Sequence, residues 1–188
     1  GFLPTGPSAS AIFDAGTTVA RLASAMPTGA LSTVVTNSLS LAAQVALANG
    51  GTQVHLLGGR VRGITQACVG NETVARLAEL RCDVAFLGTN GVSVARGFST
   101  PDQDEAAVKR AMTRAARRVV VLADSSKLGV ELLVTFAPLS SVDVLITDSG
   151  IDAASRRLFE EAGIEVIVVE PATDASQRDA QGPERAIA

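Results

Sequence analysis

The chain contains no tryptophan and no tyrosine, and its aromatic residues are six phenylalanines. Proteins that hold sugars by stacking, or that stack the bases of single-stranded nucleic acid, need aromatic platforms. The scarcity of aromatic residues therefore argues against a sugar-stacking protein and against a protein that binds single-stranded nucleic acid. A small polar ligand would have to be held by hydrogen bonds and charge, which favours a phosphorylated one.

Cysteine and histidine are also scarce. Cys68 and Cys82 have the spacing of neither a zinc ribbon nor a redox pair, and both lie among apolar residues, so we expect buried thiols. The single histidine, His55, lies in an apolar run and is interpreted as a structural histidine rather than a base. Neither a transition-metal cluster nor a Ser–His–Asp triad can be assembled, so we expect no metal, no cofactor and no catalysis.

An excess of basic charge is missing too. The formal net charge is −3, whereas domains that bind DNA usually carry a clear basic excess. No apolar run approaches the roughly 20 residues of a membrane span, and no secretory signal is visible. We therefore expect a soluble, cytoplasmic chain that contacts neither DNA nor membrane by itself.

What the chain does have is an alternation of apolar, strand-like runs with amphipathic helical stretches, typical of an α/β fold. The predicted strands are Ala11–Phe13, Leu31–Thr36, Gln53–Leu57, Asp83–Gly88, Arg118–Ala123, Val142–Thr147 and Glu165–Val169. The predicted helices are Thr17–Met26, Ser38–Asn49, Glu72–Leu80, Pro101–Ala116 and Ala153–Ala162. Several strands are continuous β-branched and leucine runs, which predicts an open, mostly parallel sheet flanked by helices.

The domain organisation follows from the two ends of the chain. Residues 11–170 form the predicted domain, which is long enough for one sizeable core. Residues 1–10 are rich in small residues and proline and are interpreted as a linker or tag remnant. Residues 171–188 are polar without periodicity and are interpreted as a flexible tail.

The stretch Asp14-Ala15-Gly16-Thr17-Thr18 follows the first predicted strand and opens the first predicted helix. The first turn of a helix presents N–H groups without helical partners, and the helix dipole adds positive potential there. Two threonine hydroxyls would add further donors, so this turn is expected to bind an anion, namely a phosphate. The alternative, a strand–helix turn with a threonine N-cap and no ligand, stays open.

Other strand ends carry similar polar turns. These are Thr36-Asn37-Ser38, Gly58-Gly59-Arg60, Gly88-Thr89-Asn90-Gly91 and Asp124-Ser125-Ser126-Lys127. Because the carboxyl ends of parallel strands meet at one edge of a sheet, we expect these turns to converge on one crevice. Together they predict an anion and polyol site.

The predicted helix at Pro101 adds carboxylates and a lysine. Thr100 is expected to be its N-cap, with Gln103 completing a capping box, after a loop over residues 97–100. Glu105 and Lys109 share a helix face, which is typical of a surface ion pair. The alternative is a carboxylate and a lysine that face the crevice and bind, or do acid–base chemistry on, a sugar.

The sequence resembles the effector-sensing domain of DeoR-family bacterial transcription regulators. The resemblance covers about residues 12–169 and is carried by Ile12-Phe13-Asp14-Ala15-Gly16-Thr17-Thr18, Val35-Thr36-Asn37-Ser38, Leu56-Leu57-Gly58-Gly59, Ala85-Phe86-Leu87-Gly88, Asp104-Glu105-Ala106-Ala107-Val108-Lys109-Arg110-Ala111-Met112 and Ala123-Asp124-Ser125-Ser126-Lys127. It implies a fold similar to ribose-5-phosphate isomerase and the CoA transferases. It also implies a winged helix-turn-helix domain in the complete regulator, which nothing before Ile12 matches, so we expect an isolated or truncated sensor.

The resemblance also implies residue roles. Gly16, Thr17 and Thr18 match a phosphate-cradling loop, and Asn37 and Gly59 match ligand contacts at strand ends. Asn90 and Gly91 stand where the isomerase has an acidic loop, which puts isomerase chemistry in doubt. Including the neighbouring polar residues, the predicted ligand-binding set is Asp14, Gly16, Thr17, Thr18, Asn37, Gly59, Arg60, Asn90, Gly91, Asp102, Glu105, Lys109 and Lys127.

The hypothesis favoured by these features is a non-catalytic sensor. It would bind a small phosphorylated sugar or polyol and control an attached DNA-binding domain, as a homo-oligomer, dimer or tetramer. The alternatives are a sugar-phosphate isomerase or CoA-transferase-like enzyme with Glu105 or Asp102 as base, and a bare oligomerisation module with an empty crevice. The missing carboxylates at Asn90 disfavour the enzyme, and the clustered polar turns disfavour the empty module.

Overall fold

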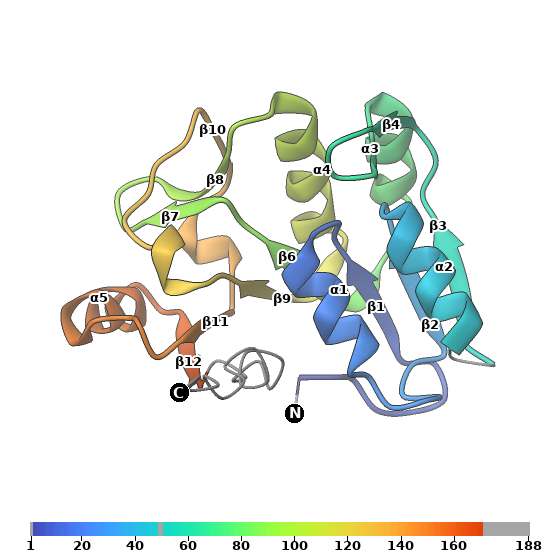
Figure 1. Cartoon of the computed structure of the whole chain (residues 1–188), viewed down its shortest axis with the longest axis horizontal. Coiled ribbons are helices and arrows are strands. Elements are labelled where there is room, and N and C mark those ends of the chain that lie inside the picture. Colours follow the sequence, from blue (N-terminus) through green and yellow to red (C-terminus); the bar gives the residue numbers. More distant parts are fainter. Residues whose placement is uncertain (1, 49–50, 171–188) are drawn as a thin grey trace, which may run out of the picture.

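A seven-stranded, fully parallel sheet forms the centre of the domain in the computed structural model, which describes residues 2–48 and 51–170 (Figure 1). Its strands are β1 (Ser10–Phe13), β2 (Thr33–Thr36), β3 (Gln53–Leu56), β6 (Cys82–Gly88), β9 (Ala116–Leu122), β11 (Val144–Asp148) and β12 (Glu165–Val169). Their order across the sheet is β12-β11-β9-β6-β1-β2-β3.

This order creates a topological switch point between β1 and β6. From β1 the chain proceeds outward through β2 to β3, and it then returns to β6 and proceeds the opposite way to β12. The loops that leave β1 and β6 therefore diverge to opposite sides and open a crevice at their carboxyl ends. Polar residues follow both strands there, Asp14 after β1, and Thr89 and Asn90 after β6.

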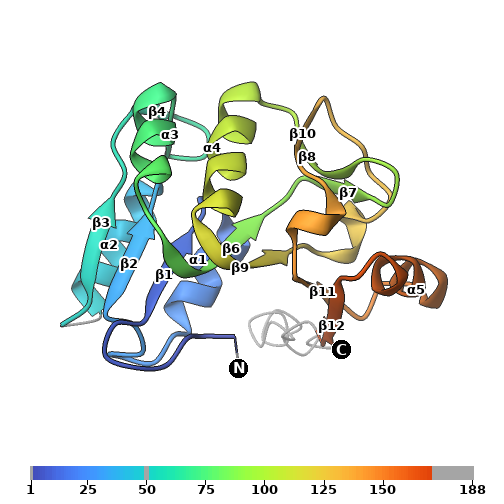
Figure 2. The same ribbon diagram turned by 180° about the vertical axis from the view of Figure 1, so that it is seen from behind.

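Helices cover both faces of the sheet (Figures 1 and 2). Their bounds are α1 (Thr17–Ser24), α2 (Leu39–Ala48), α3 (Asn71–Ala78), α4 (Gln103–Arg114) and α5 (Ala153–Glu161). One core cluster lies under α1 and α2, where Val19 and Leu41 pack with Phe13 and Phe86, whose rings stack at 5.2 Å. The other lies under α3 and α4 around residues such as Leu77 and Met112. Burial on both faces explains why the central strands are almost wholly apolar.

The predicted fold class, an α/β open parallel sheet, is confirmed. All seven predicted strands belong to the main sheet, and all five predicted helices are present, with ends that differ by up to two residues. Asn49, the last residue of the predicted second helix, and the predicted tail at residues 171–188 lie outside the described residues. In the predicted linker, Phe2 and Leu3 pack against the core cluster under α1 and α2.

Two local predictions are wrong. Residues 97–100, expected to be a loop, form strand β8 (Gly97–Thr100), which pairs with β7 (Gly91–Ser93) and β10 (Val134–Ala137) in a three-stranded antiparallel sheet. Helix α4 begins at Gln103 with Asp102 as its N-cap, because the Asp102 carboxylate accepts from the Glu105 N–H at 2.9 Å. Thr100 is thus the end of a strand rather than a cap.

A two-stranded antiparallel hairpin that the sequence did not predict connects β3 to α3. It consists of β4 (Arg60–Arg62) and β5 (Ala67–Val69). Gly59 precedes it with φ 142°, and a Cβ there would lie 2.3 Å from the Thr73 hydroxyl and 2.7 Å from the Val69 carbonyl oxygen. Close approach of backbone to α3 and an unusual φ therefore explain this glycine.

We expect Gly59→Ala to lower the free energy of unfolding by about 1–3 kcal/mol, because the added methyl group has no space and the backbone conformation disfavours it. Urea unfolding of the protein without ligand measures this. The matched control is Gly58→Ala, where a Cβ meets nothing within 4 Å. Equal stability of the two variants would contradict this account of Gly59.

Candidate functional site

A cavity of about 310 Å³ opens at the switch point, beyond the carboxyl ends of β1, β6 and β9. Nine of the thirteen residues predicted to bind ligand line it: Asp14, Gly16, Thr17, Thr18, Asn37, Asn90, Glu105, Lys109 and Lys127. They come from four loops and two helices, α1 and α4, that are far apart in sequence, so the convergence of polar strand ends expected from the topology is present.

The N-terminus of α1 forms one wall. Gly16, in the N-cap position with φ 151°, supplies no side chain, and no side chain of the described residues forms a capping hydrogen bond at this end of the helix. Thr17 and Thr18 are the first two residues of α1 and are exposed at the cavity. The threonine N-cap of the alternative interpretation therefore does not occur, because Gly16 holds the cap position. The N–H groups of the first turn consequently face the cavity without helical partners, as the anion-binding hypothesis requires.

A buried ion pair forms the centre of the site. The Lys109 ammonium binds the Asp14 carboxylate and also donates to the Gly88 carbonyl oxygen at 2.9 Å. The Gly88 N–H donates to Asp14 at 3.1 Å, so the pair joins β1, β6 and α4. The side chains of Lys109 and Asp14 are only 7% and 3% exposed. Because buried charges require compensation, the Asp14 carboxylate balances the charge of Lys109, which also lines the cavity.

Lys127 provides a second cation at the cavity. It belongs to the short 3-10 turn Ser125–Lys127 after β9, whose first N–H groups are organised by Asp124. The Asp124 carboxylate accepts from the Ser126 N–H at 3.1 Å and from the Ser126 hydroxyl. Within residues 2–48 and 51–170, Lys127 has no carboxylate within ion-pair distance, so its charge is available to an anion.

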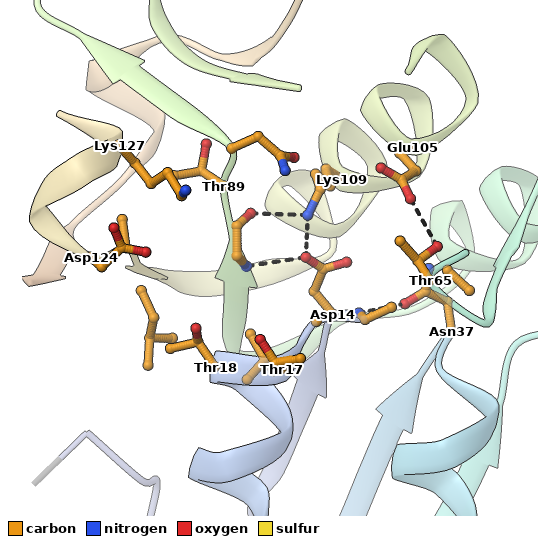
Figure 3. A pocket seen from close by; sticks show the side chains of 18 residues that line it. Asp14, Thr17, Thr18, Asn37, Thr65, Thr89, Glu105, Lys109, Asp124 and Lys127 are labelled. Carbon is orange, nitrogen blue, oxygen red and sulfur yellow. Dashed lines mark hydrogen bonds and ion pairs between the residues drawn. The ribbon is translucent and has the colours of Figure 1, made fainter. Parts of the chain in front are cut away.

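The opposite wall is formed by Glu105 and Thr65. Glu105 accepts from Arg62 at 3.1 Å and from the Thr65 hydroxyl at 3.0 Å through one oxygen. Its other oxygen has one weak contact, from the Thr100 hydroxyl at 3.4 Å. Figure 3 shows Thr17, Thr18, Asp124 and Lys127 on one side of the Asp14–Lys109 pair, and Thr65 and Glu105 on the other.

Asn37 is a buried structural link at this wall. Its side-chain oxygen accepts from the Ala15 N–H at 3.1 Å, and its amide nitrogen donates to the Cys68 carbonyl oxygen at 3.1 Å. The side chain therefore ties the loop after β1 to strand β5 of the hairpin. It lines the cavity while it holds two of the cavity's walls together.

Four residues of the predicted set do not line the cavity: Gly59, Arg60, Gly91 and Asp102. Gly59 packs on α3, and a Cβ on Gly91 would lie 2.5 Å from the Val130 carbonyl oxygen, so both glycines are explained by close packing. Arg60 forms an exposed ion pair with Asp104. Asp102 caps α4 and binds Arg62; the Glu105 N–H and the Arg62 guanidinium hold the pKa of its carboxyl below the ordinary value.

Three expectations for titratable side chains have different outcomes. The surface pair between Glu105 and Lys109 does not form, because Glu105 binds Arg62 and Lys109 binds Asp14. His55, interpreted as a structural histidine, is exposed on the edge strand β3 and does not line the cavity. Cys68 and Cys82 are buried free thiols, as predicted, and burial raises the pKa of both.

Sequence reasoning missed three polar residues of the lining, Thr65, Thr89 and Asp124. Thr89 and Asp124 lie in turns that the sequence had marked, beside residues that were chosen. Thr65 lies in the unpredicted hairpin, and no sequence signal placed it near the site.

Two kinds of feature are not found in the described part of the chain. No three or more histidine, cysteine, aspartate or glutamate side chains gather there in a way that could hold a metal ion. None of its helices has the length and apolar character needed to cross a membrane.

The amino-acid sequence of this chain is similar to those of known proteins. The family described as "DeoR C terminal sensor domain" matches residues 6–149. The HTH-type transcriptional regulator GlpR of Haloferax volcanii is 41% identical over 155 residues, covering 82% of this chain and 60% of that protein. A putative aga operon transcriptional repressor of Escherichia coli O157:H7 is 33% identical (84% and 58% covered), and the repressor GlcR of Bacillus subtilis is 34% identical (85% and 60% covered).

The chain belongs to the DeoR C-terminal sensor domain family. It spans about 60% of the length of these regulators. The match includes the strands and loops that build most of the cavity, from the loop after β1 to Lys127.

We expect Lys109→Met to lower the free energy of unfolding by about 3–5 kcal/mol, because it leaves the Asp14 carboxylate buried without its partner. Adding Asp14→Asn should recover much of this loss. Urea unfolding of the single and double variants gives the coupling energy.

The control is Lys127→Met, which removes an unpaired lysine from the same cavity and should change stability by less than about 0.5 kcal/mol. A loss in Lys109→Met no larger than in this control would show that the buried pair does not stabilise the fold.

Proposed function

We propose that this domain is a sensor that binds a small phosphorylated sugar or polyol, and that occupancy controls DNA binding by a winged helix-turn-helix domain of the same regulator. The observation that carries the proposal is the two-ended polarity of the cavity. One end offers the first turn of α1 and Lys127, and the other offers the Glu105 carboxylate and the Thr65 hydroxyl.

Each end suits a different part of such a ligand. Unpaired N–H groups at a helix N-terminus and a lysine ammonium favour a phosphate. A carboxylate with an acceptor site left open favours hydroxyl donors. The neutral Asp14–Lys109 pair separates the two ends and adds no net charge between them (Figure 3). Phosphate at one end and hydroxyls at the other is the polarity of a sugar phosphate.

Binding without turnover is the form of this function that the site supports. An isomerase needs a base at the substrate and a second group that stabilises the enediolate. Glu105 already accepts from Arg62, Thr65 and Thr100, and the exposed side chain at the loop after β6 is the neutral amide of Asn90. The names of the relatives, all transcriptional regulators or repressors, agree with a sensor.

The regulatory part of the proposal concerns the intact protein. Regulators that bind two-fold symmetric operators are usually symmetric oligomers, so we propose that this domain also forms the dimer or tetramer. Both edge strands of the main sheet, β3 and β12, have one side without a neighbouring strand in the described structure, and the acidic chain itself is not proposed to contact DNA.

The test is a thermal-shift series with glycerol 3-phosphate, fructose 1-phosphate and glucose 6-phosphate, each paired with its unphosphorylated parent. A phosphorylated ligand at 100 times its dissociation constant should stabilise the fold by about 2.7 kcal/mol, or roughly 5–10 °C at this chain length. The parents should have little effect, and NMR should recover the ligand unchanged. Equal thermal shifts with the unphosphorylated parent compounds would contradict the phosphate assignment. Steady conversion of the ligand would favour the alternative of a sugar-phosphate isomerase.

Thr18→Glu tests where the phosphate lies. A carboxylate in the first turn suits the helix dipole, so the fold should persist while repulsion abolishes the ligand shift. Thr28→Glu places the same charge after the other end of α1 and should leave the shift intact. Retention of the shift in Thr18→Glu would place the phosphate elsewhere.

A further inference from the structure

The β4–β5 hairpin is fastened to the N-terminal part of α4 by side chains of opposite charge. Arg62 donates from Nε to Asp102 at 3.2 Å and from a terminal nitrogen to Glu105 at 3.1 Å. Arg60, on the same strand, pairs with Asp104. The Arg62 side chain is 24% exposed, whereas that of Arg60 is 64% exposed, so the Arg62 contacts are the better shielded.

The same hairpin forms a wall of the cavity. Thr65, close to its tip, lines the cavity and donates to the Glu105 oxygen that Arg62 also binds. Ala67 of β5 lines it too, and the adjacent Cys68 is tied to Asn37 through the backbone and the side chain. Arg62 itself does not line the cavity. It therefore acts on the cavity only through Glu105 and the hairpin.

Glu105 is consequently shared between the hairpin and the cavity. A carboxylate has about four acceptor sites, and in Glu105 three contacts are present, two on one oxygen and the weak one from Thr100 on the other. A ligand hydroxyl can take the remaining site without displacing Arg62 or Thr65. Such a ligand would bridge α4 and the hairpin wall, so hairpin docking and ligand binding would strengthen each other.

We propose that Arg62 is a positioning residue for the hydroxyl end of the ligand, and that the β4–β5 hairpin is a strap whose docking on α4 is coupled to ligand binding through Glu105. This inference rests on the proposed function and adds to it a residue outside the cavity and an element that responds to occupancy. By linkage, the factor by which the ligand favours the docked strap equals the factor by which docking strengthens ligand binding, so a variant that undocks the strap lowers the affinity for the ligand.

The two ends of the cavity also determine for which ligands binding is coupled to docking of the hairpin. Inorganic phosphate can occupy the α1 end alone and has no reach to Glu105. A sugar phosphate fills both ends. Loosening the strap therefore lowers the affinity for sugar phosphates but not that for inorganic phosphate. A general loss of folding would lower both affinities.

The experiment compares Arg62→Ala with Arg60→Ala, a matched removal of an arginine from the same strand. Calorimetric titration uses inorganic phosphate and whichever of glycerol 3-phosphate, fructose 1-phosphate and glucose 6-phosphate stabilises the wild type most. We expect Arg62→Ala to raise the dissociation constant of the sugar phosphate about tenfold and that of inorganic phosphate by less than about twofold. Arg60→Ala, which breaks an exposed pair, should change both by less than about twofold.

Hydrogen exchange of residues 60–69 supplies a readout that does not depend on affinity. The sugar phosphate should slow exchange there in the wild type, and Arg62→Ala without ligand should exchange faster than Arg60→Ala. Equal behaviour of the two variants, or equal weakening of both probes in Arg62→Ala, overturns the strap. If the wild type binds none of the phosphate probes, both the proposed function and the coupling are wrong. If the wild type binds a sugar phosphate and Arg62→Ala binds it equally well, only the strap proposal is wrong.

Discussion

The buried pair of Asp14 and Lys109 is the interaction on which the rest of the site depends. It joins the loop after β1, the end of β6 and helix α4, which are the elements that meet at the switch point of the sheet. Two charges so far from water persist only when each satisfies the other and both have further partners, and the Gly88 N–H and carbonyl provide these. The pair thereby ties α4 to the carboxyl ends of β1 and β6 at the cavity.

This neutral centre divides the cavity into unlike ends. The α1 end is built from backbone: an uncapped helix N-terminus after Gly16, with Lys127 opposite. The Glu105 end is built from side chains that hold one another, since Arg62, Thr65 and Thr100 all donate to one carboxylate. Under the proposed function the phosphate lies at the first of these ends and the hydroxyls at the second, so occupancy can alter a hairpin that reaches the surface, where Ile64 at its tip is 87% exposed.

The sheet and its helices could be predicted because they follow from hydrophobic periodicity, and the polar turns that carry Asp14, Thr18 and Lys127 were expected to converge because of the α/β topology. The strand order, and with it the switch point between β1 and β6, is known only from the structure. The hairpin could not be predicted, since β4 and β5 are three residues each and depend on distant partners on α4. For the same reason Thr65 was missed. Asp102 and Lys109 were both predicted to bind the ligand, and only the structure shows that Asp102 caps α4 and that Lys109 forms the buried pair with Asp14.

The central claim, a cavity with a phosphate end and a hydroxyl end, is tested most directly by NMR titration of the backbone amides. A sugar phosphate from the series above should shift the amides of residues 16–19 and, separately, those of residues 64–67, whereas inorganic phosphate should shift the first group alone. Shifts from the sugar phosphate that avoid residues 16–19, or that never reach the hairpin, would contradict the account.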